Sequence, residues 1–134
     1  MTKVLVFGTF DGIHEGHLDF FRQAKKYGDY LVVVVGRDVT VEKVKNRKPL
    51  KNETERMGDL QKQDLVDQVL LGNVDDPYKI IAEIKPDVIC LGYDQKSFTG
   101  SLQKALDNLN FKTQVVRLKA FKPEKYHSSG LNER

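Results

Sequence analysis

The sequence predicts an α/β fold: a single domain over residues 1–134, with a doubly wound sheet of about five parallel strands and helices on both faces. Short runs rich in valine, leucine and isoleucine alternate with longer segments of helical period. The runs are apolar throughout, which is typical of parallel strands buried on both faces. A chain of this length buries a core without disulfides, and no linker or repeat divides it.

Five segments have the strand pattern, and each is bounded by turn residues. They are "KVLVFG" at 3–8, "YLVVVVG" at 30–36, "DQVLLG" at 67–72, "DVICLG" at 87–92 and "TQVVRL" at 113–118. Helical segments separate them, so the predicted architecture is Rossmann-like.

The first helix is expected after the first strand. Apolar residues recur at three-to-four spacing in "HLDFFRQAKKYG", and the helix should begin between His14 and Gly16. Gly28 is expected to end it in the left-handed conformation, because glycine adopts that conformation without steric cost.

A second helix is indicated by "NETERMGDLQ", where Asn52 and Glu55 have the spacing of a capping box. This places Arg56 in the first turns of that helix. Two further helices are expected within "PYKIIAEIK" at 77–85 and "SLQKALDNL" at 101–109.

The charge balance excludes some classes of protein. There are 22 basic and 19 acidic residues, a net charge of +3, which is too balanced for a nucleic-acid coat. One basic cluster stands out, "KVKNRK" at 43–48, and we interpret it as a loop. No run is long enough to cross a bilayer and the N-terminus lacks the layout of a signal peptide, so we expect a cytoplasmic protein. The single cysteine, Cys90, lies in an apolar segment and is expected to be a small buried hydrophobe.

The segment "GTFDGIHEGH" at 8–17 is the strongest functional signal. A glycine-bearing turn from a strand into a helix presents unpaired N–H groups to an anion, so it can hold a phosphate. Gly8 and Gly12 allow close approach of a ligand to the backbone. His14 and His17, three residues apart at the helix start, can each donate a hydrogen bond to a phosphate oxygen.

Other interpretations of this turn fit less well. Two histidines could bind a metal, but zinc usually takes three or four protein ligands, and only His127, Cys90 and carboxylates could complete the set. The spacing matches neither the Gly-x-Gly-x-x-Gly fingerprint nor a Gly-Lys-Ser/Thr loop. A phospho-acceptor role for Asp11 would need an acidic cluster, and its neighbours are imidazoles.

Two motifs follow predicted strands. The segment 8–17 follows the first strand, and "GYDQ" at 92–95 follows the fourth. Because the carboxyl ends of parallel strands meet at one edge of the sheet, we expect both motifs at the edge where such folds bind ligands.

These residues resemble the cytidylyltransferase-like branch of the nucleotidyltransferase superfamily, in which a Gly-Thr-Phe-Asp turn precedes His-x-Gly-His. The similarity extends through "VKNRKP", "ETER", "LGYDQ" and "YHSS". A second family signature, a serine pair that holds the triphosphate, corresponds to Ser128 and Ser129 after His127. Gly130 departs from the family pattern.

The resemblance implies that a phosphate on a small molecule attacks the α-phosphate of a nucleoside triphosphate, and that pyrophosphate leaves. His14 and His17 would stabilise the reacting phosphate. A lysine would neutralise the phosphates, with Lys45 preferred over Lys43 and Lys48. The nucleotide-binding residues implied are Gly8, Thr9, Phe10, Gly16, Arg56, Asp94, His127, Ser128 and Ser129.

The resemblance also places Asp11 and Lys48 on the acceptor or magnesium side of the site. Mg²⁺ is expected together with the triphosphate, with no metal site made by the protein alone. Kinship further implies a homodimer.

Two subgroups compete for the substrate. "KPEKYHSS" lacks the Arg-Thr-Glu-Gly pattern of glycerol-3-phosphate cytidylyltransferases, whereas "RKP" and "LGYDQ" resemble archaeal-type FAD synthetases. This favours adenylyl transfer from ATP to FMN over cytidylyl transfer from CTP. The extra C-terminal cysteines of those synthetases are absent. Three aromatic residues near the expected site, Phe98, Phe121 and Tyr126, could stack on a flavin ring or simply pack.

A nucleotide-binding regulator without turnover remains an alternative, although both histidines, a lysine and the serine pair are retained. A DNA-binding domain has little support, because no recognition helix rich in arginine and asparagine or glutamine is present.

Overall fold

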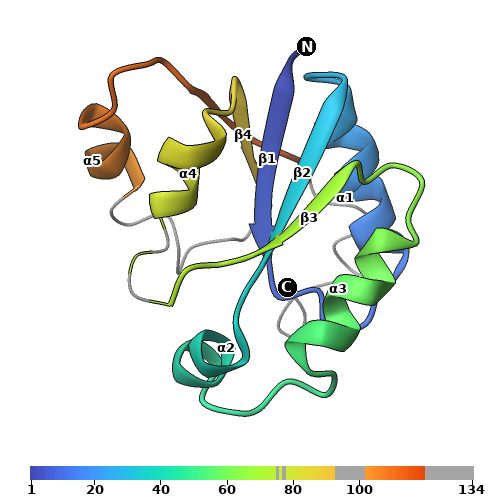
Figure 1. The fold of residues 1–134 in the computed structure, drawn as a ribbon. Helices are drawn as coiled ribbons and strands as arrows, with labels where there is room; N and C mark the ends of the chain where they lie inside the picture. The colour runs from blue at the N-terminus through green and yellow to red at the C-terminus, as the bar shows by residue number, and fades with distance from the viewer. Residues whose placement is uncertain (75, 77, 93–101, 120–134) are drawn as a thin grey trace.

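The computed structural model describes residues 1–74, 76, 78–92 and 102–119 (Figure 1). Within them, five parallel strands lie in the order β3-β2-β1-β4-β5, which confirms the predicted doubly wound sheet. The strands are β1 (Lys3–Gly8), β2 (Tyr30–Val35), β3 (Gln68–Leu71), β4 (Val88–Leu91) and β5 (Gln114–Arg117).

Helices cover both faces of the sheet, as predicted (Figure 1). Helices α1 (Glu15–Lys25) and α3 (Glu53–Gln61) lie on one face, and α4 (Lys79–Ile84) and α5 (Leu102–Asp107) lie on the other. The valine, leucine and isoleucine runs are buried because both faces are covered.

The core therefore has two halves, separated by the sheet. Val4 and Val6 of β1 belong to the half that contains Phe21 of α1. Leu5 and Phe7 belong to the half under α4 and α5. Successive side chains of a strand point to opposite faces, so one apolar run supplies both halves.

One helix was not predicted. Helix α2 (Asp38–Lys45) contains Lys43 and Lys45 in its last turn, so the interpretation of 43–48 as a loop is wrong for its first half. The segment "DVTVEKVK" has three valines, which favour strands and hide the helical period. Burial of Val41, 4% exposed, holds the helix in place despite this composition. Asn46, with φ at 58°, ends it in the left-handed region.

The end of α1 also differs from the prediction. The helix ends at Lys25, followed by Lys26 in right-handed helical conformation, and Gly28 has no positive φ. Gly28 is needed for another reason: a Cβ there would lie 2.6 Å from the Thr2 carbonyl oxygen at the start of β1. The glycine permits close approach of backbones rather than a left-handed cap.

The predicted capping box of α3 is confirmed. Asn52 Oδ1 accepts the N–H of Glu55 at 2.8 Å, and Glu55 Oε1 accepts the N–H of Asn52 at 2.9 Å. This fixes the start of α3 and with it the position of Arg56, one residue further along.

Cys90 is fully buried in β4, as predicted, and it is a free thiol. Burial raises the pKa of this thiol to about 12, because an apolar environment disfavours the thiolate. Its contribution is therefore packing rather than chemistry.

The helices in the described part of the chain are short, and α1 has 11 residues. A bilayer-spanning helix needs roughly 20 apolar residues. No helix among those described reaches the length and apolar character required for a membrane span.

Candidate active site

The strand order reverses between β1 and β4, since β2 and β3 lie on one side of β1 and β4 and β5 lie on the other. In doubly wound sheets this is where ligands bind, beyond the carboxyl ends of the strands. The turn that follows Gly8 lies at this edge, as expected. Gly92, after β4, shares the edge because Val4 pairs with Val88 in parallel.

His14 and His17 form the start of α1. His14 is the N-cap, and its Nδ1 accepts the N–H of Gly16 at 3.0 Å. His17 Nδ1 accepts the N–H of His14 at 3.2 Å, which closes a capping box made of two imidazoles. The rings stack with centroids 3.8 Å apart. The sequence predicted that the pair shares one face, and the structure shows how the pair is held there.

These bonds determine which ring nitrogens carry protons. Because Nδ1 of both rings accepts a backbone N–H, a neutral ring carries its proton on Nε2. An Nε2–H group is of the kind that can donate a hydrogen bond to a phosphate oxygen. His14 is half-buried and His17 is 2% exposed.

The Phe10 side chain packs against His17 in the core. Its side chain is 1% exposed, with its ring edge-on to His17 at 5.4 Å and tilted against Phe21 at 5.5 Å. The Phe10 ring is thus part of the core, and the nucleotide-binding role that the resemblance implies for this residue stays a prediction. The Phe10 ring therefore helps to hold the His17 ring in place by packing against it.

The backbone of the turn explains two of its glycines. Phe10 has φ at 54°, which turns its ring back over Gly8, where a Cβ would lie 2.7 Å from the ring. Gly12 has φ at 96°, and its N–H donates to the Phe10 carbonyl at 3.0 Å. A side chain at either position would open the turn that presents the histidines.

Asp11 is bound to the loop between α2 and α3. Its Oδ2 accepts the N–H of Leu50 at 2.7 Å, and its Oδ1 accepts the N–H of Lys51 at 2.9 Å. The predicted role of Asp11, on the acceptor or magnesium side, stays a prediction. What the structure assigns to it is the link between the turn and this loop.

Arg56 has three protein partners and a fully buried side chain. Nη1 donates to the Thr9 carbonyl at 2.8 Å, Nε donates to the Lys51 carbonyl at 3.0 Å, and Nη2 pairs with Asp38 Oδ1 at 2.6 Å. In this arrangement the three nitrogens bond to the protein, and the nucleotide contact that the resemblance implies for Arg56 stays a prediction. The buried cation joins the turn to α2 and α3.

Burial separates the three candidate lysines. Lys45 is half-buried at the end of α2, whereas Lys43 and Lys48 are exposed. Lys51, nearby in the sequence, pairs with Asp59 at 2.7 Å, and this hydrogen bond raises the pKa of its ammonium. The preference for Lys45 as the partner of the phosphates stays a prediction.

Four predicted residues lie outside the described part of the chain. They are Asp94, His127, Ser128 and Ser129. The three aromatic residues considered for flavin stacking lie outside it as well. Their roles stay predictions.

The sequence reasoning missed Asp38 and Glu53, which surround Arg56. Glu53 Oε1 accepts the N–H of Asp38 at 2.8 Å. Each is an acidic residue in the first turn of a helix, a common pattern that by itself indicates only a favourable interaction with the helix dipole. Nothing in the sequence showed that the two helix starts face each other.

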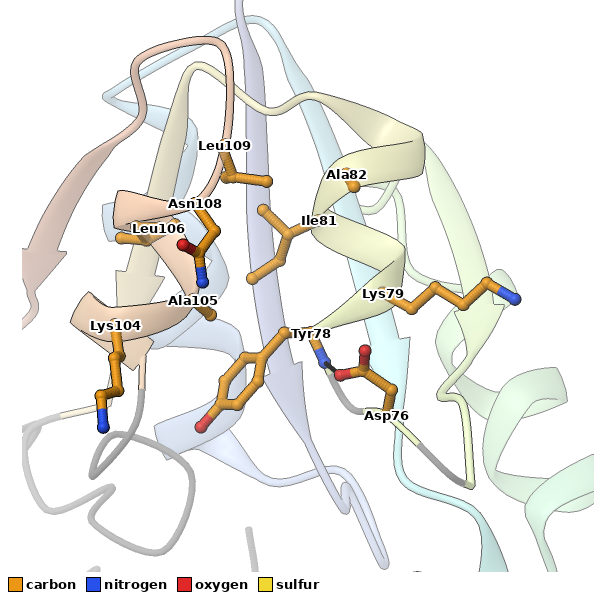
Figure 2. A pocket seen from close by; sticks show the side chains of 10 residues that line it. All are labelled: Asp76, Tyr78, Lys79, Ile81, Ala82, Lys104, Ala105, Leu106, Asn108 and Leu109. Carbon is orange, nitrogen blue, oxygen red and sulfur yellow. Dashed lines mark hydrogen bonds between the residues drawn. The ribbon is translucent and has the colours of Figure 1, made fainter.

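A separate groove of about 470 Å³ lies between α4 and α5 (Figure 2). Figure 2 shows Ile81 and Leu109 between the two helices, with the Tyr78 ring at one end. Asp76 Oδ1 accepts the N–H of Tyr78 at 3.0 Å. Of the predicted site residues that the structure describes, none lines this groove, and neither histidine of the pair belongs to it.

The sheet order and the histidine pair at the carboxyl end of β1 are those of an α/β protein that binds its ligand at a topological switch point. Residues 5–134 match the model of the cytidylyltransferase-like family, and the chain belongs to that family.

The similarity to known proteins extends over most of the chain. It is 44% identical over 132 residues to the FAD synthase of Aciduliprofundum boonei, covering 98% of this chain and 85% of the relative. It is 40% identical over 121 residues to the FAD synthase of Thermoplasma acidophilum, covering 90% and 84%. The crystal structure of the lipopolysaccharide core biosynthesis protein from Thermoplasma volcanium GSS1 superposes with a TM-score of 0.84 and 37% identity, covering 91% of this chain and 99% of that one.

Proposed function

We propose that this protein is a nucleotidyltransferase that transfers the adenylyl group of ATP to FMN, forming FAD and releasing pyrophosphate. The observation that carries the proposal is 44% identity with an FAD synthase over 98% of the chain. This match extends over 132 of the 134 residues, and the geometry of the glycine and histidine turn suits a reacting phosphate.

The chemistry is a single displacement. An oxygen of the FMN phosphate forms a bond to the α-phosphorus of ATP, and the bond from that phosphorus to the bridging oxygen of the β-phosphate breaks. The electron pair leaves with pyrophosphate. No covalent bond to the protein forms.

The histidine pair supports this step through its Nε2–H groups. The capping box directs Nδ1 of both rings into the helix start, and we assign the donation to oxygens of the α-phosphate to Nε2. Donors that are positioned before the reaction stabilise the charge that builds up in the transition state, because they need no reorganisation. Lys45 adds positive charge beside the triphosphate in this proposal.

Magnesium accompanies the nucleotide in this proposal. Among the described residues, no group of three or more histidine, cysteine or acidic side chains could hold a metal ion. Both oxygens of Asp11 accept backbone N–H groups. The described residues of the site are therefore compatible with a Mg²⁺ that is held by triphosphate oxygens and water, which is how the ion usually binds with nucleotides. The ion would spread the negative charge of the phosphates.

The proposal is tested by product formation with ATP or CTP against FMN or glycerol-3-phosphate. We expect FAD and pyrophosphate only from ATP with FMN. CDP-glycerol from CTP would instead establish the second subgroup considered from the sequence. If the protein binds ATP but no pair gives pyrophosphate, it is a nucleotide-binding regulator and the proposal fails.

Two expectations belong to this proposal and stay predictions: a cytoplasmic location and a homodimer. Light scattering coupled to size-exclusion chromatography measures the mass in solution, and a value near the monomer mass of 15.3 kDa would contradict the dimer.

A further inference from the structure

The starts of α2 and α3 cap each other. Glu53 Oε1 accepts the N–H of Asp38 at 2.8 Å, and Asp38 Oδ2 accepts the N–H of Glu53 at 3.2 Å. Helix α3 also has its own cap, Asn52. Helix α2 does not, because its N-cap residue, Arg37, makes no side-chain capping bond. The side-chain cap of α2 therefore comes from α3.

Two arginines offset the electrostatic repulsion between the carboxylates of Asp38 and Glu53. Arg37 Nη1 pairs with Glu53 Oε2 at 3.2 Å, and Arg37 Nε donates to the Gly72 carbonyl at 3.0 Å. The buried Arg56 pairs with Asp38 at 2.6 Å. Each acid thus has its own cation, and the repulsion between them is offset.

The position of α2 depends on contacts with other segments. It has eight residues, too few to be stable alone, so contacts with the rest of the protein must hold it. Val41 is its buried residue near the middle, and Glu53 holds its start. Figure 1 shows α2 beyond the carboxyl edge of the sheet, where β1 and β2 end. Lys45 is at its far end.

We infer that Glu53 is a positioning residue for the proposed reaction: by capping α2 from α3, it sets the place of Lys45 at the phosphates. The inference rests on the proposed function. Glu53 itself touches no substrate in it. Loss of the cap releases the start of α2, and the half-buried lysine at the other end moves with the helix.

A double-mutant cycle tests the inference. Lys45→Ala, Glu53→Ala and the double variant are compared with the unchanged protein by calorimetric ATP affinity and by kcat/KM for ATP. We expect Glu53→Ala to weaken ATP binding about tenfold and to leave KM for FMN unchanged, with less than about a twofold further effect once Lys45 is removed. Equal losses in both backgrounds would overturn the inference.

Matched variants separate positioning from general destabilisation. Glu55→Ala removes the other acidic cap in the same turn of α3, its 2.9 Å bond to Asn52, without touching α2. It should lower stability and leave ATP affinity unchanged. Glu53→Gln keeps an acceptor for the Asp38 N–H and should restore most of the affinity.

Amide hydrogen exchange provides a readout that needs no turnover. Exchange of the α2 amides should speed up in Glu53→Ala and stay unchanged in Glu55→Ala. Unchanged α2 exchange in Glu53→Ala overturns the inference whatever the enzyme does. If the unchanged protein binds ATP but makes no FAD, the proposed function fails while the affinity cycle still decides the role of Glu53.

Discussion

The backbone N–H of His14 donates to Nδ1 of His17 over 3.2 Å, so the two histidines hold each other in place without a ligand. His14 also caps the helix through Gly16. The His14 side chain therefore has two roles: it caps the helix and, in the proposal, it donates to a phosphate. Substitutions can separate these roles.

His14→Asn should keep the helix and lose the reaction. Asparagine is a good N-cap but has no imidazole, so stability should be nearly unchanged while FAD formation falls about a hundredfold or more. His14→Ala should lose the same activity and in addition about 1 kcal/mol of stability. Urea unfolding and the rate of FAD formation measure the two effects. An active His14→Asn would show that the histidine serves only as a cap.

Gly8→Ala should destabilise the protein because its Cβ would meet the Phe10 ring at 2.7 Å. A buried ring has no room to move away, so a loss of about 1–3 kcal/mol is expected. Gly58→Ala is the matched control, since a Cβ in the middle of α3 meets nothing within 4 Å. It should stabilise by up to about 1 kcal/mol. Thermal unfolding of both variants measures the two effects. Equal shifts of the unfolding temperature would contradict the packing described at Gly8.

Arg56→Met should cost about 3 kcal/mol, because it leaves buried acceptors without a donor and Asp38 without its cation. Arg56→Lys should retain only part of the stability that Arg56→Met loses, since an ammonium cannot reach three separated acceptors as a guanidinium does. Lys62→Met, at an exposed position just after α3, should stay within about 0.5 kcal/mol. Denaturant unfolding measures all three. Unchanged stability together with weaker ATP binding would support the nucleotide-contact role implied by the family resemblance.

Cys90 gives a pH dependence whose sign follows from its raised pKa. Between the ordinary thiol pKa of 9.0 and the folded value of about 12, the folded state holds a proton that the unfolded state releases. Stability must then fall as the pH rises above 9. From pH 8 to pH 10 the unchanged protein should lose about 1 kcal/mol more than Cys90→Ala.

The accompanying measurement for Cys90 is its reaction with a thiol reagent at pH 8. The folded protein should react only after unfolding, because the thiol is fully buried. Rapid reaction of the folded protein would show that β4 is exposed to solvent.

The sequence determined the sheet and most of its helices. Five apolar runs predicted the five strands, since a strand buried on both faces needs apolar side chains at nearly every position. The capping box at Asn52 and Glu55 was equally readable, because its partners are three residues apart. The histidine pair was found for the same reason: its spacing on a helix is local information.

What only the tertiary structure decided depends on contacts between distant segments. Helix α2 was missed because its valines favour strands, and contacts with distant segments, such as the burial of Val41 and the cap from Glu53, help to hold it as a helix. Gly28 was expected to be a helix end, but the reason for it is the approach of Thr2, 26 residues earlier in the chain.

The candidate site follows the same division. The family resemblance placed Phe10 and Arg56 among the functional residues, but it did not give the direction in which each side chain points. A positive φ turned Phe10 into the core, and acceptors on three other segments drew Arg56 inside. A local pattern can specify a helix start or a strand, whereas the burial of a charge requires partners that only the folded chain brings together.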